Sequence, residues 1–425
     1  MKNNPKISII GGTIWGNRGA EAMLVTTICQ LRQRFPDASF NIFSYYADKD
    51  RSLVSDPHIR VYDSSPKALI LHHLLGTLIF KVLIIFGIKP SAGKLLKIPS
   101  ALANSDCLLD IGGITFSDGR EKFLPFNILT IWPAIILGTP VVKLAQALGP
   151  FKHRLNRNLA RIFLSRCKHI FARGKESAAH LAHLSLTDSQ SEPAADIAFL
   201  YTSDCSLSSE NEPRVQELLR GLDRQKQKGK KIIVFSPSIL VHAKMAQLGK
   251  DYIQQFLSLI QHFGSQDFFY LFLPNSTRET STEKHNNDIL LINHIAARVR
   301  QECDQKTAKD AIAFIDFDIN TRSIRKLISY ADILLTSRYH AMISGLSLSI
   351  PTIVIGWSHK YHETMQSFNL SQYVFDINAS TPNLSKSIAD MLENAFAIKK
   401  EIVNRLPEVQ NLAQKQYHYL ERLLR

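Results

Sequence analysis

The stretch DILLTSRYHAMISGLSLSIPTIVIGW, residues 332–357, decides the fold of this chain. It begins with a short apolar run that ends at Thr336, continues with a segment of helical spacing, and reaches a second apolar run after Pro351. Two buried strands joined by one helix form the repeating unit of parallel sheets. The stretch therefore predicts a doubly wound α/β domain.

The same alternation of apolar runs and helical segments extends over both halves of the chain. Strands are predicted at 6–10, 39–46, 107–113, 128–138, 140–146 and 169–174, and then at 231–237, 268–274, 311–317, 332–336 and 352–356. Helices are predicted at 20–35, 249–263, 285–302 and 321–330, and residues 383–425 are helical in period apart from Pro407. Both halves are therefore expected to be α/β.

The chain has 425 residues, more than one hydrophobic core usually supports. It becomes polar and charged between Ser203 and Lys231, as domain boundaries do. We predict a Rossmann-like domain at 1–205, a linker at 206–230, a second Rossmann-like domain at 231–380, and helices at 381–425 that pack back across both. Because ligands of such sheets bind at the carboxyl ends of strands, we expect the chemistry in a cleft between the domains.

The formal net charge of +14 favours anionic partners, such as phosphorylated metabolites or an anionic membrane surface. The basic residues are spread along the chain, and no nucleic-acid module with interleaved aromatic residues is present, so nucleic acid is not expected. The five cysteines form no CxxC pair, which argues against a disulfide framework and favours a reducing compartment. The N-terminus runs into a predicted strand instead of an apolar signal core, so a cytoplasmic location is expected.

Residues 68–88, ALILHHLLGTLIFKVLIIFGI, are long and apolar enough to resemble a membrane span. His72, His73, Gly76 and Lys81 weaken that interpretation. A buried or docking helix, an interfacial helix on the inner face of the cytoplasmic membrane, and a true span all remain open. Peripheral membrane contact through this segment is one expectation.

The residues after the strand that ends at Thr336 have the composition of an anion site. Ser337 can cap the next helix, and Arg338 can hold a carboxylate or phosphate with two parallel hydrogen bonds. His340 can transfer a proton, and a bound phosphate would favour its charged form against the positive helix end. A core histidine bonded to a carbonyl is the alternative for His340, but its position beside Arg338 at a strand end favours function.

Three further loops follow predicted strands. Gly16, Asn17, Gly19 and Glu21 lie where the first strand meets its helix; they can face a ligand or merely allow a tight turn. The segment 110–113 ends a strand in two glycines. They can let a ligand or the opposing domain approach the backbone, or they can simply allow tight packing of the chain. Arg173 precedes another helix and can contact an anion in the buried cleft or form a salt bridge at the surface.

No metal site is predicted. His359 and His362 follow the strand at 352–356, but their spacing with Glu363 matches no zinc signature. No cofactor is expected either, because the first loop is not GxGxxG and no acidic residue ends the second strand.

Five segments of the chain resemble the polysaccharide pyruvyl transferase family, and the likeness extends over residues 6 to about 370. The segments are GNRGAEAM (16–23), DIGGITFSDG (110–119), ARGKES (172–177), NSTRETSTEKHNND (275–288) and TSRYHAMISGLSLSIPTIVIGWSHKYHE (336–363). The Arg-x-His helix start is the strongest element of the likeness. The resemblance implies a GT-B-like pair of domains that moves the enolpyruvyl part of phosphoenolpyruvate onto a sugar, which can be lipid-linked, leaving a pyruvate ketal and phosphate.

The resemblance also implies roles for individual residues. Arg338 and His340 match the donor-binding and catalytic pair, and Tyr339 stands where the family more often has Leu. The implied donor-binding residues are Ser337, Tyr339, Arg173 and Lys360, and the implied acceptor-binding residues are Asn17, Gly19, Glu21 and Gly113. In place of the usual Asp after the arginine, this chain has Gly174.

Two other functions fit the same sequence. A nucleotide-sugar glycosyltransferase could use the same fold and the same basic helix start for a pyrophosphate. A membrane-surface scaffold could use the positive charge together with residues 68–88.

Overall fold

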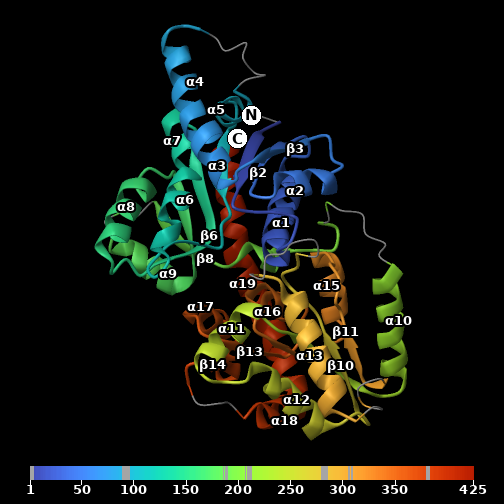
Figure 1. Ribbon diagram of the computed structural model, residues 1–425. Coiled ribbons are helices and arrows are strands. Elements are labelled where there is room, and N and C mark those ends of the chain that lie inside the picture. The colour runs from blue at the N-terminus through green and yellow to red at the C-terminus, as the bar shows by residue number, and fades with distance from the viewer. Residues whose placement is uncertain are drawn as a thin grey trace. The chain divides into compact units, whose positions relative to one another are not determined.

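The computed structural model describes residues 4–88, 96–184, 186, 190–205, 207, 213–278, 286–304, 307, 310–379 and 383–425, with the side chain of His359 excepted. The chain divides into two compact units (Figure 1). Unit 1 comprises Met1–Trp15, Ala20–Ser208 and Gln410–Arg425, and unit 2 comprises Gly16–Gly19 and Ser209–Val409.

Unit 1 is built on a parallel sheet of eight strands in its described part. The strands are β1 (Lys6–Ile10), β2 (Ser39–Ser44), β3 (Ile59–Asp63), β4 (Cys107–Asp110), β5 (Ile114–Ser117), β6 (Val141–Gly149), β7 (His169–Arg173) and β8 (Ser191–Ala194). Their order is β3-β2-β1-β4-β6-β7-β8, and β5 pairs with β6. Strand β6 is buried at every position because it lies inside the sheet, where both faces of a parallel strand are covered.

The helices of this unit alternate with its strands. They are α1 (Arg18–Arg34, whose first two residues belong to unit 2), α2 (Ala47–Leu53), α3 (Pro66–Ala68), the π-helical η1 (Leu69–Leu75), α4 (Gly76–Ile85), α5 (Lys97–Ala103), η2 (Glu121–Phe123), α6 (Leu124–Leu129), α7 (Trp132–Leu137), α8 (Arg154–Leu164), α9 (Gly174–Ala182) and η3 (Ile197–Leu200).

Unit 2 contains a parallel sheet of six strands in the order β11-β10-β9-β12-β13-β14. The strands are β9 (Lys231–Ser236), β10 (Phe268–Phe272), β11 (Ile312–Phe314), β12 (Ile333–Thr336), β13 (Thr352–Gly356) and β14 (Val374–Asp376). The helices are α10 (Pro213–Gln227), α11 (Ile239–Gln247), α12 (Tyr252–Phe263), α13 (Asp288–Glu302), α15 (Thr321–Ile328), α16 (Tyr339–Ser347), α17 (His359–Gln366), η4 (Ser371–Tyr373), α18 (Leu384–Glu393) and α19 (Ala395–Leu424). This strand order is that of a Rossmann-type sheet.

Local sequence explains where several helices of unit 2 begin. The Asp251 carboxylate accepts hydrogen bonds from the backbone N–H groups of Ile253 and Gln254, and Asn320 accepts one from Ser323. Such side-chain caps satisfy N–H groups that have no partner inside the helix. Helix α15 then turns Ile324, Leu327 and Ile328 into the core.

The α/β class is confirmed in both units, and the structure corrects the prediction in several places. Residues 128–138 are not a strand, because Pro133 lies in the first turn of α7 and Gly138 ends that helix in a left-handed conformation. The predicted linker at 206–230 contains α10. Strands β3, β5, β8 and β14 are short and were missed.

The domain limits also differ from the prediction at two places. The loop Gly16–Gly19 belongs to unit 2, although the predicted first domain contained it. The last helix continues through Pro407, with Ala395–Val409 in unit 2 and Gln410–Arg425 in unit 1. In unit 1, Tyr417 is fully buried beside Thr27 of α1, and Gln416 donates to the Ala195 carbonyl.

One disulfide, Cys29–Cys205, joins α1 to the end of the first unit. The cysteine spacing did not predict it, because the two residues are 176 positions apart and meet only in the tertiary structure. Cys107, Cys167 and Cys303 are free. The spacing of the cysteines therefore no longer argues for a reducing compartment.

Candidate active site

In the sheet of unit 2, the order of successive strands reverses between β9 and β12. Strands β10 and β11 lie on one side of this pair and β13 and β14 on the other. Thr336 at the end of β12 is in register with Ser236 at the end of β9. In open α/β sheets ligands bind outside the carboxyl ends of the strands at such a point of reversal. The segment Ser337–His340 begins there.

Ser337 does not cap helix α16, which corrects the prediction. Its hydroxyl is hydrogen-bonded to the Tyr252 hydroxyl at 2.6 Å, and its carbonyl accepts a hydrogen bond from the Tyr361 hydroxyl at 3.0 Å. Burial raises the pKa of the Tyr252 phenol, so this group remains protonated. The two tyrosines hold the strand end in place.

Arg338 occupies the N-cap position of α16, and the Thr336 hydroxyl accepts a hydrogen bond from its backbone N–H at 2.9 Å. Its guanidinium forms an ion pair with Asp288, and the two side chains are 13% and 0% exposed. Among the described residues, Nε of Arg338 has no hydrogen-bond partner. The arginine is therefore held by one carboxylate and keeps a donor for another.

Asp288 is the residue that organises this end of the sheet. Besides pairing with Arg338, it accepts hydrogen bonds from the backbone N–H groups of Ile239 at 3.1 Å, Asn275 at 3.2 Å and Ser276 at 2.9 Å. These bonds join the loops that follow β9 and β10. Sequence reasoning missed Asp288, because an acidic residue in the first turn of a helix is usually a solvated contribution to the helix dipole.

His340 lies in the first turn of α16, and its ring lies against Gly19. A Cβ atom at position 19 would overlap Nδ1 and Cγ of the imidazole. The ring of Tyr339 also meets the imidazole edge to face, with the ring centres 5.4 Å apart. Only glycine leaves room for the histidine at this contact.

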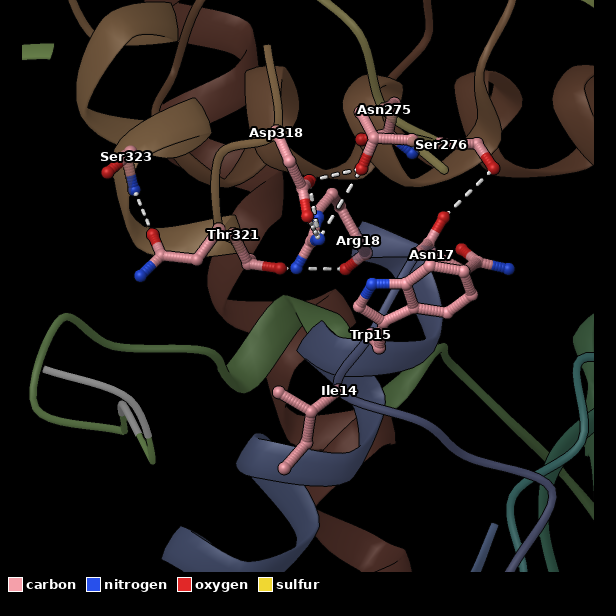
Figure 2. A network of polar contacts seen from close by, with 12 residues as sticks. Ile14, Trp15, Asn17, Arg18, Asn275, Ser276, Asp318, Thr321 and Ser323 are labelled. Atoms are coloured by element: carbon pink, nitrogen blue, oxygen red, sulfur yellow. Dashed lines mark hydrogen bonds and ion pairs between the residues drawn. The ribbon is translucent and has the colours of Figure 1, made fainter. Parts of the chain in front are cut away.

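The loop that contains Gly19 is anchored inside unit 2 (Figure 2). Asn17 forms an antiparallel bridge with Ser276, and the Gly16 carbonyl accepts a hydrogen bond from the Thr277 N–H at 2.9 Å. The Asn17 amide oxygen also accepts a hydrogen bond from the Gly19 N–H at 3.1 Å. The structure thus brings Asn17 and Gly19, both predicted in the sequence, to the same site as His340.

Arg18 provides the strongest anchor of this loop, and sequence reasoning missed it. It is only 4% exposed, and its terminal nitrogen donates to both oxygens of Asp318 at 2.7 and 2.9 Å. The backbone N–H of Arg18 donates to the Asn275 carbonyl, and the Arg18 carbonyl accepts a hydrogen bond from the Thr321 hydroxyl (Figure 2). Charge-assisted hydrogen bonds of this kind are about twice as strong as neutral ones.

Tyr339 and Lys360 also lie at this site. The Lys360 ammonium is 4.7 Å from the centre of the Tyr339 ring and 5.4 Å from that of Tyr361. The Tyr339 hydroxyl is hydrogen-bonded to Thr364 at 2.9 Å. The cation therefore lies on an aromatic surface beside the start of α16.

A second group of predicted residues lies in unit 1, at the point where β1 and β4 are adjacent and the strand order reverses. Gly11 has a φ of +87°, and a Cβ there would be 2.6 Å from the Gly112 nitrogen. The two loops can approach because both positions lack side chains. Beneath them, Asp110 forms a fully buried ion pair with Lys143, which sequence reasoning also missed.

Arg173 and Gly113 are directly bonded in unit 1. The Arg173 guanidinium donates to Asp196 at 2.7 Å and to the Gly113 carbonyl at 2.7 Å, and Asp196 is fully buried. The sequence alternatives for Arg173 were an anion contact in the cleft and a salt bridge at the surface, whereas the structure shows a salt bridge that is buried. Glu21 is 4% exposed in the first turns of α1. The predicted site residues therefore fall into two groups, one in each unit.

The described part of the chain contains no group of three or more His, Cys, Asp or Glu residues able to hold a metal ion. The side chain of His359 lies outside the described residues.

The fold is shared with solved structures of sugar-nucleotide proteins. A UDP-GlcNAc 2-epimerase from Neisseria meningitidis, solved with UDP-GlcNAc, is 14% identical with a TM-score of 0.57, covering 98% of this chain and 100% of that chain. MnaA from S. aureus, in a co-structure with UDP, is 13% identical with a TM-score of 0.58, covering 94% and 91%. Both support a GT-B-like two-domain α/β fold.

The family model for polysaccharide pyruvyl transferases matches residues 17–359. The match begins at the anchored Asn17 loop and includes Asp288, Arg338 and His340. It covers most of the chain and every predicted site residue except Lys360. The chain therefore belongs to the polysaccharide pyruvyl transferase family, a family of enzymes.

Proposed function

We propose that this enzyme moves the enolpyruvyl group of phosphoenolpyruvate onto a sugar of a cell-surface polysaccharide or of its lipid-linked precursor. The products are a pyruvate ketal on the sugar and free phosphate. The observation that carries the proposal is the start of α16, where Arg338 and His340 lie together at the reversal point of the unit 2 sheet. The reaction is proposed for the cytoplasm, since phosphoenolpyruvate is an intracellular metabolite.

The donor carries a carboxylate and a phosphate, and unit 2 offers complementary groups for both. Arg338 retains an unused Nε donor, and the first N–H groups of α16 have no acceptor within the helix. Lys360 adds a second positive charge over the Tyr339 ring. Asp288 keeps the Arg338 guanidinium in one orientation, so little rearrangement is needed when the donor binds.

The chemistry requires one proton donor and stabilisation of negative charge. A proton adds to the methylene carbon of phosphoenolpyruvate, and the adjacent carbon becomes an oxocarbenium-like centre. A sugar hydroxyl attacks this carbon and loses its proton. The carbon–oxygen bond to phosphate then breaks, phosphate leaves with the bonding electrons, and a second hydroxyl closes the ketal and loses its proton.

His340 is the proposed proton donor, and Arg338 and Lys360 are the proposed counter-charges for carboxylate and phosphate. A positioned general acid contributes roughly a hundredfold to ten-thousandfold in rate. The acceptor residues proposed are Asn17, Gly19, Glu21 and Gly113, and the proposed donor site also includes Ser337, Tyr339 and Arg173. The roles of these residues rest on the family resemblance.

The test is incubation of the purified enzyme with phosphoenolpyruvate and extracted lipid-linked glycans, followed by product mass and phosphate release. We expect a ketal on the glycan and equimolar phosphate. His340→Ala should lower turnover roughly a hundredfold to ten-thousandfold, while His262→Ala, an exposed histidine on α12 of the same unit, should not change it. Near-normal turnover of the His340→Ala enzyme would refute the assignment of the acid.

A nucleotide-sugar glycosyltransferase is the alternative, because structural neighbours of this fold were solved with UDP or UDP-GlcNAc. A ligand that binds only the native state raises the melting temperature. Stabilisation by phosphoenolpyruvate and not by nucleotide sugars supports the pyruvyl transfer. Stabilisation by nucleotide sugars alone would replace it with glycosyl transfer.

A further inference from the structure

A continuous helix, Pro66–Ile85, has a buried inner face and an exposed, apolar outer face. The inner face, which includes Leu69, His73, Thr77 and Phe80, is packed on unit 1. The outer face and the turn after it carry ten large apolar side chains, each at least 44% exposed: Ile70, Leu71, Leu75, Leu78, Ile79, Val82, Ile84, Ile85, Phe86 and Ile88. We call these ten residues the outer apolar face. Figure 1 shows α4 projecting beyond the sheet of its unit.

This surface is unusual for a protein in water. The helix is long and apolar enough to cross a membrane, and only 33% of its most apolar stretch is buried. Monomeric soluble proteins rarely expose contiguous apolar patches of more than a few hundred Å² unless the patch binds something. The spacing of Leu71, Leu75, Leu78 and Val82 places them on one side of the helix, so the exposed residues form a stripe.

Within the segment that carries the stripe, the charged side chains have one sign. Residues 64–105 contain no Asp or Glu. The same segment contains five lysines, Lys67, Lys81, Lys89, Lys94 and Lys97. Lys67, Lys81 and Lys97 are exposed, whereas Lys89 and Lys94 lie outside the described residues. An apolar stripe bordered by positive charge matches the surface of an anionic bilayer, where acyl chains lie beneath phosphate groups.

A basic groove lies on the other side of the neighbouring helix α5. Ile98, Pro99 and Leu102 of α5 are buried, and Pro99 is the nearest neighbour of Gly76 in α4. The groove, of about 840 Å³, is lined by four exposed basic residues, Lys6, Arg51, Arg60 and Lys97, and its described lining contains no carboxylate, although Arg51 is paired with the exposed Asp48. Positive charge therefore continues beyond the helix itself.

We infer that the outer apolar face inserts in the plane of an anionic membrane surface, with the bordering lysines at the headgroup phosphates. The inner face excludes a span, because crossing the bilayer would remove Leu69 and Phe80 from the core and break the hydrogen bond between His73 and the Asp63 carbonyl. Pairing of two copies through this face would bring like-charged lysines together. The inference is independent of the reaction that the enzyme catalyses.

The test is flotation of the full-length protein with vesicles of phosphatidylcholine, with and without phosphatidylglycerol as one third of the lipid. We expect the protein to float with the anionic vesicles. Ile79→Ser with Ile85→Ser should weaken binding at least roughly tenfold, because two side chains that are 54% and 72% exposed lose their contact with lipid. The matched control is Leu155→Ser with Ile162→Ser on α8, which are 53% and 47% exposed.

Charge is tested separately with Lys67→Gln and Lys81→Gln, against Lys168→Gln and Lys228→Gln as exposed controls. The first pair should weaken binding to anionic vesicles, and high salt should do the same. Absence of flotation, or equal loss in the control variants, would overturn the inference. So would resistance of the bound protein to alkaline carbonate, which indicates a span, or a dimer in light scattering that Ile79→Ser with Ile85→Ser abolishes.

Discussion

Gly19 and His340 are in direct contact, although they are 321 positions apart in the sequence, and the space for the imidazole exists only because residue 19 has no side chain. The contact lies within unit 2, since Gly16–Gly19 is joined to that unit through Arg18 and Asn17. The first glycine loop and the Arg-x-His helix start are therefore parts of one site.

Gly19→Ala should impair catalysis while the fold is retained. Alanine is favourable in a helix, but its methyl group would displace the His340 ring. A misplacement of about 1 Å can cost roughly a hundredfold in rate, and we expect a loss of that order in phosphoenolpyruvate-dependent transfer. Gly221→Ala is the control, because a Cβ there meets only Arg224, at 3.9 Å. Equal activity of the two variants would contradict this account of the contact.

Asp288→Asn should destabilise the protein. The substitution leaves the Arg338 charge without its buried partner and places an amide NH₂ near the backbone donors of Asn275 and Ser276. Breaking a buried ion pair costs roughly 3–5 kcal/mol, which urea unfolding can measure. Asp251→Asn is the control, since its pair with Arg298 is largely exposed and asparagine also caps helices well. A loss no larger than that of the control would show that Arg338 does not depend on Asp288.

Stability should decrease as the pH falls from about 6.5 to about 4, because of His73. Burial lowers the pKa of its imidazole to about 4, and its Nε2 lies 2.9 Å from the Asp63 carbonyl. The unfolded chain, with a histidine pKa near 6.5, therefore binds a proton in this range that the native state does not. This contribution to stability is complete above pH 6.5 and is lost on acidification.

The expected loss between pH 7 and pH 5 is roughly 2 kcal/mol from this residue. Urea unfolding of the native chain and of His73→Gln at both pH values measures it. The glutamine variant should show the smaller pH dependence, because its amide does not titrate. His72→Gln, an exposed neighbour, should behave like the unmodified chain. Identical pH dependence of all three proteins would rule out His73 as the titrating group.

Thiol counting should find three free cysteines in the unfolded, unreduced protein and five after reduction. Cys29 and Cys205 are joined, whereas Cys107, Cys167 and Cys303 are free. In the native state we expect Cys303 to react first, because Cys107 and Cys167 are fully buried and burial raises the pKa of the Cys167 thiol to about 12.

Closing a loop of this length stabilises the native state by roughly 5 kcal/mol in the chain-entropy model. Reduction should therefore lower the melting temperature, and Cys29→Ser should melt at the same temperature with or without reductant. Five reactive thiols before reduction would show that the bond does not form.

The sequence was sufficient for the α/β class, for most strands of unit 2 and for the position of Arg338 and His340 at a strand end. These features depend on residues that are near one another in the chain. The spacing of apolar residues, the helical segment after Thr336 and Pro351 are all local signals. It was insufficient at 128–138, where an apolar run has the same composition in a buried strand and in a short helix.

Only the tertiary structure decided which residues accompany Arg338 and His340. The sequence assigned Ser337 as a cap, but the fold brings Tyr252 to its hydroxyl. Asp288 resembles an ordinary first-turn acid until folding buries it against Arg338. These partners are the first residues of helices α12 and α13, which are far from Arg338 in the chain, and strand order brings them together. The local pattern predicted an anion site after β12, and long-range packing determined which side chains contact Arg338 and Ser337.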